Sequence, residues 1–221
     1  MMKKYYPILF TFFLAAVLIS CNNNPSNPFE NEIQAFEKMD LDNPPGTGMI
    51  LFVGSSSLRM WKDIDKVFPD FNVLNRGFGG SQTSDVIHFF DRVVKVYKPS
   101  KIVFYEGDND IATGKSPAQV VADFKTFLEL MDKDLAGTPI CFIAIKPSPS
   151  RWELHNEMEE ANKLIREICN QRPDLEFVDV YSLMLDQNGR PKPEIYISDS
   201  LHMNAEGYEI WKHALISCLE D

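Results

Sequence analysis

Apolar residues gather in five short runs, and a segment of helical periodicity follows each of them. The runs span residues 49–53, 71–75, 101–106, 140–145 and 176–180. Continuous apolar runs of this length are typical of strands buried on both faces of a parallel sheet. The segments with helical spacing span approximately 57–67, 83–97, 117–135, 153–171 and 204–219. This alternation predicts an α/β fold of three layers, in which helices cover both faces of a five-stranded parallel sheet.

A further helix is expected before the first strand. Phe29, Ile33, Phe36 and Met39 recur at helical spacing within residues 28–40, and we expect this helix to dock on the domain. The preceding residues, 22–27, are Asn, Ser and Pro, which is typical of a tether.

The first twenty residues have the features of an export signal. Lys3 and Lys4 precede an apolar stretch over residues 8–19, which is short for a membrane span. The stretch ends in Leu-Ile-Ser-Cys at Cys21, which resembles a bacterial lipobox. The resemblance implies cleavage before Cys21, lipidation of its thiol, and a protein anchored in the bacterial cell envelope, in the outer membrane facing the periplasm or the exterior. An uncleaved signal anchor and a plain secretory peptide are the alternatives.

Length, composition and charge limit the kinds of protein that this chain can be. The 221 residues suffice for one sizeable domain, and 44% of them are hydrophobic. A formal net charge of -10 argues against a nucleic-acid partner, because little could neutralise phosphates over a broad face. Beyond Cys21, the cysteines are Cys141, Cys169 and Cys218. Their odd number and wide spacing predict buried free thiols, with neither a disulfide nor a metal site.

Polar motifs follow three of the predicted strands, and a fourth lies near the C-terminus. The motifs occupy residues 54–57, 75–80, 107–110 and 199–202. The carboxyl ends of parallel strands share one edge of the sheet, which is where open α/β folds place their ligands. We therefore expect the four motifs to meet in one site.

The first motif supplies a candidate nucleophile. Ester hydrolysis needs an activated nucleophile, a base and donors for the oxyanion. Ser56 follows Gly54, which permits a tight turn, and its backbone N–H is free at the start of a helix. Ser55 and Ser57 are rivals on composition alone, and all three serines could simply cap the helix.

The last motif supplies a base and its orienting acid. A neutral imidazole at His202 can take and return a proton near physiological pH, and Asp199 is three residues earlier on the same loop. Helix capping is the alternative. His88, His155 and His213 lie in helical patterns.

Gly80 and Asn109 are the candidate oxyanion donors, through a backbone N–H and a side-chain amide that cannot ionise. Loop flexibility is the alternative for the glycines, and a turn is the alternative for residues 108–110.

Taken together, the motifs resemble the four sequence blocks of the SGNH (GDSL-type) hydrolase superfamily, in order, over about residues 48–219. The branch that includes platelet-activating-factor acetylhydrolase subunits and small bacterial acylhydrolases is the most similar. The resemblance implies a flavodoxin-like sheet, no cofactor and no metal. It also implies a triad of Ser56, His202 and Asp199, with an oxyanion hole formed by Ser56, Gly80 and Asn109. The domains expected are then a signal peptide over 1–20, a lipidated tether and short helix over 21–47, and a hydrolase domain over 48–221.

One residue departs from the family pattern, because Ser55 stands where the family has aspartate. We expect its hydroxyl to hydrogen-bond within the turn. Five residues are candidates for the pocket border, although helix packing for Trp61 and a solvated loop for Arg151 are equally good interpretations. They are Arg59, Trp61, Lys146, Arg151 and Trp152.

The expected activity is hydrolysis of a short acyl ester, acetyl first, of a carbohydrate or small molecule. A lysophospholipase or long-chain esterase is the second interpretation, and a non-catalytic carbohydrate-binding lipoprotein is the third. The sequence does not indicate an oligomeric state.

Overall fold

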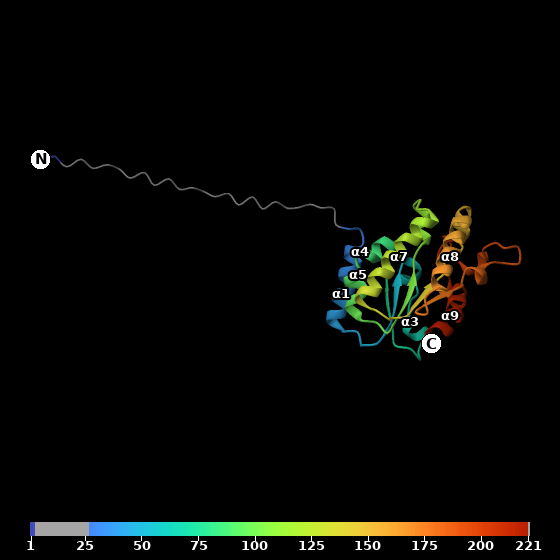
Figure 1. Cartoon of the computed structure of the whole chain (residues 1–221), viewed down its shortest axis with the longest axis horizontal. Helices are drawn as coiled ribbons and strands as arrows, with labels where there is room; N and C mark the ends of the chain where they lie inside the picture. Colours follow the sequence, from blue (N-terminus) through green and yellow to red (C-terminus); the bar gives the residue numbers. More distant parts are fainter. Residues whose placement is uncertain (3–26, 221) are drawn as a thin grey trace.

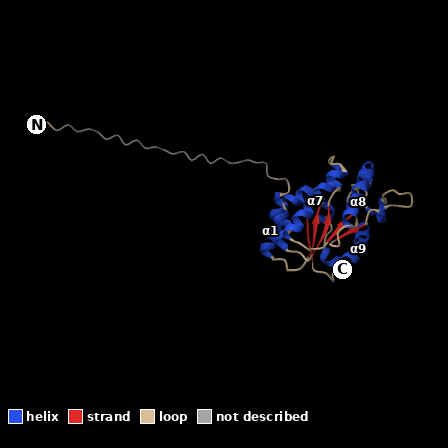
Figure 2. Cartoon of the chain, viewed as in Figure 1, coloured by secondary structure: helices blue, strands red, loops and turns tan. Residues whose placement is uncertain are grey.

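The predicted three-layer architecture is confirmed. The computed structural model describes residues 1–2 and 27–220, so the expected signal peptide and Cys21 lie outside the described residues. The five strands pair in parallel in the order β2-β1-β3-β4-β5 (Figures 1 and 2). They are β1 (Ile50–Gly54), β2 (Val73–Gly77), β3 (Lys101–Tyr105), β4 (Ile140–Ile143) and β5 (Leu175–Val178).

Helices cover both faces of the sheet (Figure 1). One face carries α2 (Ser56–Arg59), α3 (Ile64–Val67) and α9 (Ala205–Glu220), and the other carries α4 (Thr83–His88), α5 (Phe90–Val93), α7 (Pro117–Asp134) and α8 (His155–Cys169). A short helix, α6 (Asp108–Ala112), follows β3 directly. The 3-10 turns are η1 (Lys95–Tyr97), η2 (Pro149–Leu154), η3 (Ser182–Met184) and η4 (Pro193–Ile195).

Aromatic side chains fill the core on both sides of the sheet. On the α7 side, Phe104 contacts Phe127 at a ring-centroid distance of 4.4 Å. On the α9 side, Trp61 contacts Phe68 at 5.5 Å and Trp211 at 6.0 Å. Neighbouring residues of a strand point to opposite faces of the sheet. Phe104 therefore packs in the cluster on the α7 side, whereas Tyr105 packs in the cluster on the α9 side, where its ring centroid lies 4.7 Å from that of Trp211. Burial of these rings on both faces stabilises the sheet, and with it the edge at which the site is expected.

Several predicted boundaries were wrong. Strand β2 begins and ends two residues later than expected, because it continues through the polar residue Arg76. That side chain is buried and donates hydrogen bonds to Tyr97 Oη at 2.7 Å and to Asp40. The single helix expected over 83–97 is three short helices, interrupted by the non-helical backbone angles of Phe89 and Val94.

The expected N-terminal helix is α1 (Glu30–Asp42), and it docks on the domain as predicted. Ile33 is fully buried, and the Phe29 ring packs edge-on against Phe78 at 5.3 Å. Arg92 of α5 donates to Glu30 at 2.9 Å and to Glu37 at 2.6 Å. Helix α1 is thus attached by apolar burial and by ion pairs.

The prediction of free thiols was wrong for two of the three cysteines. Cys141 of β4 and Cys218 of α9 form a disulfide with a Cα–Cα distance of 6.2 Å, although 77 residues separate them in the sequence. Cys169 is a buried free thiol, as predicted. The wide spacing of the cysteines in the sequence did not reveal this pair, because the pairing depends on α9 returning over the face of β4.

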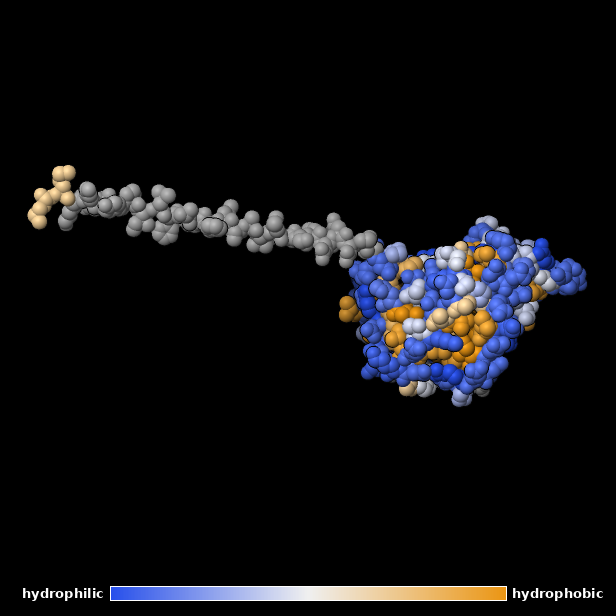
Figure 3. Space-filling view, turned by 45° about the horizontal axis from the view of Figure 1, so that its top comes forward, coloured by the Kyte–Doolittle hydropathy of each residue, from blue (hydrophilic) through white to orange (hydrophobic). Residues whose placement is uncertain are grey.

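The face drawn in Figure 3 is largely polar, with apolar side chains gathered near its centre. Within residues 1–2 and 27–220, no helix is both long enough and apolar enough to span a bilayer.

Candidate active site

The first motif places Ser56 at the beginning of α2, directly after β1. Gly54 makes this turn with φ +146°, and a Cβ atom there would lie 1.9 Å from the carbonyl oxygen of Tyr105. Only glycine permits this approach of β1 to β3. The turn leaves the Ser56 side chain partly exposed at the carboxyl edge of the sheet.

Ser56, His202 and Asp199 form a continuous hydrogen-bonded chain. Ser56 Oγ–H donates to His202 Nε2 at 2.8 Å, and His202 Nδ1–H donates to Asp199 Oδ2 at 2.6 Å. The other carboxylate oxygen of Asp199 accepts from the backbone N–H groups of Leu201 and His202, both at 2.9 Å. The short loop therefore fixes both the acid and the ring that it orients.

Asp199 stays ionised in this environment. Partial burial acts to raise its pKa, but the hydrogen bonds from the His202 ring and from two backbone N–H groups outweigh it and lower the pKa to about 2. A permanent carboxylate holds the Nδ1–H tautomer and leaves Nε2 free to accept the serine proton.

Burial distinguishes the three neighbouring serines. Ser55 is 0% exposed and Ser57 is 1% exposed, so only Ser56 both touches His202 and reaches solvent. The expectation that the Ser55 hydroxyl bonds within the turn was wrong, because its buried Oγ has no partner among the described residues. The backbone N–H of Ser55 donates to the Tyr105 carbonyl at 3.1 Å, and this bond holds the turn.

Each of the three expected oxyanion donors keeps an N–H group that is free to bind a ligand. Within the described part of the chain, the backbone N–H groups of Ser56 and Gly80 donate to no acceptor. Gly80 has φ +78°, which favours glycine. The Asn109 amide donates one hydrogen to the Ser81 carbonyl at 2.9 Å and keeps its second.

One buried acid next to the third motif was not predicted from the sequence. Glu106 is fully buried, and one of its oxygens accepts a hydrogen bond of 2.6 Å from Ser81 Oγ. Burial and the charge of Asp110 raise its pKa well above the usual range. Its position at the end of an apolar strand is the only signal, and it does not distinguish a buried acid from an exposed one.

Helix α1 also reaches the site, which the sequence did not indicate. The Glu32 carboxylate accepts from the Gly79 backbone N–H at 3.1 Å, one residue before Gly80. Arg59 forms an ion pair with Glu32 at 3.6 Å and packs beneath Gly79. The glycine loop is therefore held from two sides.

The candidates for the pocket border have different roles. Trp61 is buried and stacks on Tyr208 at 5.1 Å, so the packing interpretation was correct. Lys146 is buried and pairs with Asp108 at 3.2 Å. Trp152 stacks on the His155 ring at 4.4 Å.

The solvated-loop interpretation of Arg151 was wrong. Its side chain is 19% exposed, and Arg151 Nη2 donates to Asn109 Oδ1 at 2.9 Å.

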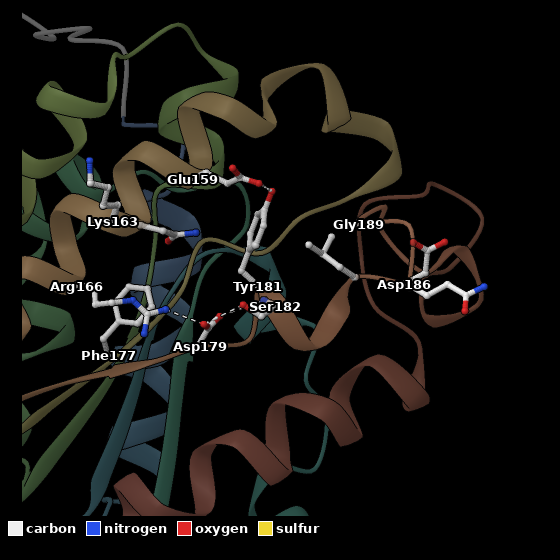
Figure 4. A pocket seen from close by; sticks show the side chains of 12 residues that line it. Glu159, Lys163, Arg166, Phe177, Asp179, Tyr181, Ser182, Asp186 and Gly189 are labelled. Atoms are coloured by element: carbon white, nitrogen blue, oxygen red, sulfur yellow. Dashed lines mark hydrogen bonds and ion pairs between the residues drawn. The ribbon is translucent and has the colours of Figure 1, made fainter.

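A cleft of about 620 Å³ lies between α8 and the segment after β5, and its lining contains none of the residues named above as catalytic (Figure 4). Its polar groups bond to one another: Tyr181 donates to Glu159 at 2.9 Å, and Arg166 donates to Asp179 at 2.7 Å. With these groups already paired, we assign the chemistry to the site at Ser56 and not to this cleft.

Among residues 27–220, no cluster of three or more His, Cys, Asp or Glu side chains is arranged to hold a metal ion. The arrangement at Ser56 can supply a nucleophile, a base, an acid and oxyanion donors, which are the groups that a serine hydrolase uses.

The comparisons agree with this class. The profile of the GDSL-like Lipase/Acylhydrolase family matches residues 53–210, and the chain belongs to that family. It is a carboxylic ester hydrolase of the α/β, flavodoxin-like type. No curated protein matches the sequence.

Solved structures share the fold at low sequence identity. A protein from Streptococcus pneumonia described as a platelet activating factor is 22% identical, with a TM-score of 0.75 over 86% of this chain and 92% of that one. A GDSL-like lipase from Bacteroides thetaiotaomicron is 18% identical, with a TM-score of 0.71 over 85% and 97%. A catalytic mutant of an acetylxylan esterase from Geobacillus stearothermophilus is 14% identical, with a TM-score of 0.63 over 78% and 94%.

Proposed function

We propose that Ser56 is the nucleophile of an esterase that removes short acyl groups, acetyl first, from a carbohydrate or another small molecule. The observation that carries the proposal is the continuous chain from Ser56 through His202 to Asp199, with distances of 2.8 and 2.6 Å. Removal of acetyl from a carbohydrate is also the activity named for the similar acetylxylan esterase.

The mechanism follows from the geometry. Ser56 Oγ attacks the ester carbonyl carbon while its proton passes to His202 Nε2, and the carbonyl electrons move onto the oxygen. The N–H groups of Ser56 and Gly80 and the Asn109 amide bind that oxyanion. The intermediate collapses, the carbon–oxygen bond to the alcohol breaks, and His202 protonates the departing alcohol.

Water then reverses these steps. His202 accepts a proton from water, the hydroxide attacks the acyl group on Ser56, and the carboxylic acid leaves as the proton returns to Ser56 Oγ. Asp199 stays ionised throughout and stabilises the imidazolium.

The test is hydrolysis of nitrophenyl esters of increasing chain length. The wild type should be most active on acetate, and Ser56→Ala should lower kcat by at least about 10³-fold because the nucleophile is lost. Ser57→Ala is the matched control and should change kcat little. A preference for long acyl chains would support the lysophospholipase alternative, and sugar binding without hydrolysis of any ester would support the non-catalytic one.

We also propose that the protein is anchored in the bacterial envelope through lipidated Cys21. The lipobox-like sequence before Cys21 supports this, and so does the Cys141–Cys218 disulfide, because such bonds persist in oxidising compartments. Labelling of cells with a radioactive fatty acid tests the anchor. Wild type should carry label and Cys21→Ser should not, and equal labelling of both would contradict the proposal.

A further inference from the structure

We propose that Arg151 is a positioning residue that determines which end of the Asn109 amide faces the oxyanion. The proposal rests on the esterase function proposed above. Two contacts define it: Arg151 Nη2 donates to Asn109 Oδ1 at 2.9 Å, and Asn109 Nδ2 donates to the Ser81 carbonyl at 2.9 Å. Arg151 lies in η2, outside the motifs that supply the triad and the oxyanion donors.

The two contacts permit only one orientation of the amide. A guanidinium can only donate, and a backbone carbonyl can only accept. If the Asn109 amide turned over, its NH₂ group would face the Arg151 donor and its oxygen would face the Ser81 carbonyl oxygen. The observed orientation satisfies both neighbours and leaves one N–H for the oxyanion.

Arg151 is itself held in place by a buried ion cluster. Arg151 Nη1 lies 3.4 Å from Asp108 Oδ2, and the same oxygen accepts from Lys146 Nζ at 3.2 Å. Burial acts to raise the pKa of Asp108, but the charges of Lys146 and Arg151 outweigh it, so the pKa lies below its usual range. Asp108 is therefore ionised and can anchor the guanidinium that its neighbour Asn109 requires.

The segment that carries Arg151 is also attached to the loop of the triad. The backbone N–H of Ser150 donates to the Ser200 carbonyl at 3.1 Å, between Asp199 and His202. Arg151 has φ -123° and ψ 22°, and this break in the helical geometry separates the two turns of η2. One short segment thus contacts both the general-base loop and the oxyanion donor.

The positive charge has a second consequence for catalysis. A cation on the amide oxygen draws electrons from the nitrogen and makes its free N–H a stronger donor. The Arg151 guanidinium lies directly behind the Asn109 amide, and a preorganised positive charge in this position stabilises an oxyanion bound to the free N–H.

A double-mutant cycle tests the proposal. Asn109→Ala should lower kcat for nitrophenyl acetate by about 100-fold or more, as is typical for loss of one oxyanion donor. Arg151→Met should lower kcat by about 10-fold with KM nearly unchanged, because loss of one polar contact is worth about 1.4 kcal/mol. In the Asn109→Ala background, Arg151→Met should lower kcat by less than about 2-fold, because its target is gone.

Two results would overturn the proposal. Equal losses of kcat in both backgrounds would show that Arg151 acts independently of Asn109. A rise in KM with unchanged kcat would identify Arg151 as a substrate contact. Arg166→Met is the matched control, because Arg166 also pairs with an aspartate, Asp179, at 2.7 Å, but lies outside the site, and its kcat should match that of wild type.

Two further measurements separate this proposal from the esterase function and from misfolding. The rate at which a fluorophosphonate labels Ser56 depends on the oxyanion hole but not on the natural ester, so Arg151→Met should slow labelling about 10-fold even if the acyl preference is wrong. No labelling of wild type would overturn both proposals. Arg151→Lys keeps the positive charge but lacks the planar guanidinium with its several fixed donors. We expect its kcat to lie between those of wild type and Arg151→Met. If Arg151→Met does not fold, a wild-type kcat in Arg151→Lys would contradict the role.

Discussion

At the scale of single residues, buried polar groups lie behind the proposed oxyanion donors. Ser81 illustrates this, because its carbonyl accepts from Asn109 at 2.9 Å while its hydroxyl donates to Glu106 at 2.6 Å. One serine therefore links the oxyanion donor to a buried carboxyl group. Since the second oxygen of Glu106 has no partner among the described residues, the protonated acid is the form that suits this environment.

Glu106 should make stability decrease as pH rises. Its pKa is raised in the folded state by burial and by Asp110, whereas in the unfolded chain it is about 4.3. Below about pH 4 both states hold the proton. Above that value the unfolded state loses the proton first, so unfolding becomes easier until the folded pKa is passed.

Chemical denaturation of wild type and Glu106→Gln at about pH 5 and about pH 8 measures this effect. The free energy of unfolding of wild type, relative to Glu106→Gln, should be lower at the higher pH. Glu37→Gln is the control, because Arg92 lowers the pKa of Glu37 and the corresponding difference should stay constant over this range. The same pH dependence in wild type and Glu106→Gln would show that Glu106 is not the group responsible.

The residues proposed to react could be selected from the sequence, while the contacts that position them could not. Ser56, Gly80 and Asn109 each follow a strand, so the parallel sheet brings them together whatever the details of packing. Arg151 and Glu32 lack such a constraint. Their contacts depend on where η2 and α1 settle, and no periodicity in the sequence encodes that placement.

At the scale of secondary-structure elements, apolar runs located the strands, but buried polar residues moved their ends. Strand β2 continues through Arg76 because Asp40 and Tyr97 supply partners for its guanidinium, and hydropathy alone ends the strand before it. The helix expected over 83–97 is broken for a different reason. Its apolar spacing is preserved across the breaks at Phe89 and Val94, so the pattern indicates the buried face without indicating helical continuity.

Helix α1 shows how an element outside the family motifs becomes part of the site. Ile33 and Phe29 anchor the helix to the domain, and Glu32 holds the backbone of Gly79 next to the oxyanion donor Gly80. The helix begins at Glu30, nine residues after Cys21.

At the scale of the whole molecule, the Cys141–Cys218 disulfide links the sheet covalently to the last helix. Cys141 lies on β4 and Cys218 lies near the end of α9, so the bond joins the middle of the domain to its C-terminus across 77 residues. Helix α9 follows directly after the loop of Asp199 and His202 and packs on β5. The bond therefore supports the element on which the triad loop ends.

Removal of this bond should destabilise the domain without abolishing its chemistry. A cross-link of this span removes chain entropy from the unfolded state equivalent to about 4 kcal/mol, so Cys141→Ser/Cys218→Ser should lose about that much free energy of unfolding. The triad does not use either sulfur, so kcat of the folded variant should stay within about 3-fold of wild type. Urea unfolding followed by activity and by tryptophan fluorescence measures both quantities.

Reduction offers an independent check on the same bond. Addition of dithiothreitol should lower the unfolding midpoint of wild type toward that of the double variant and leave the double variant unchanged. Cys169→Ser, which removes the buried free thiol, should respond to dithiothreitol as wild type does. A wild-type midpoint that does not move after complete reduction would show that packing of α9, and not the covalent bond, holds the C-terminal element to the sheet. The stability of the triad loop would then depend on Trp211 and its aromatic neighbours, Trp61 at 6.0 Å and Tyr105 at 4.7 Å.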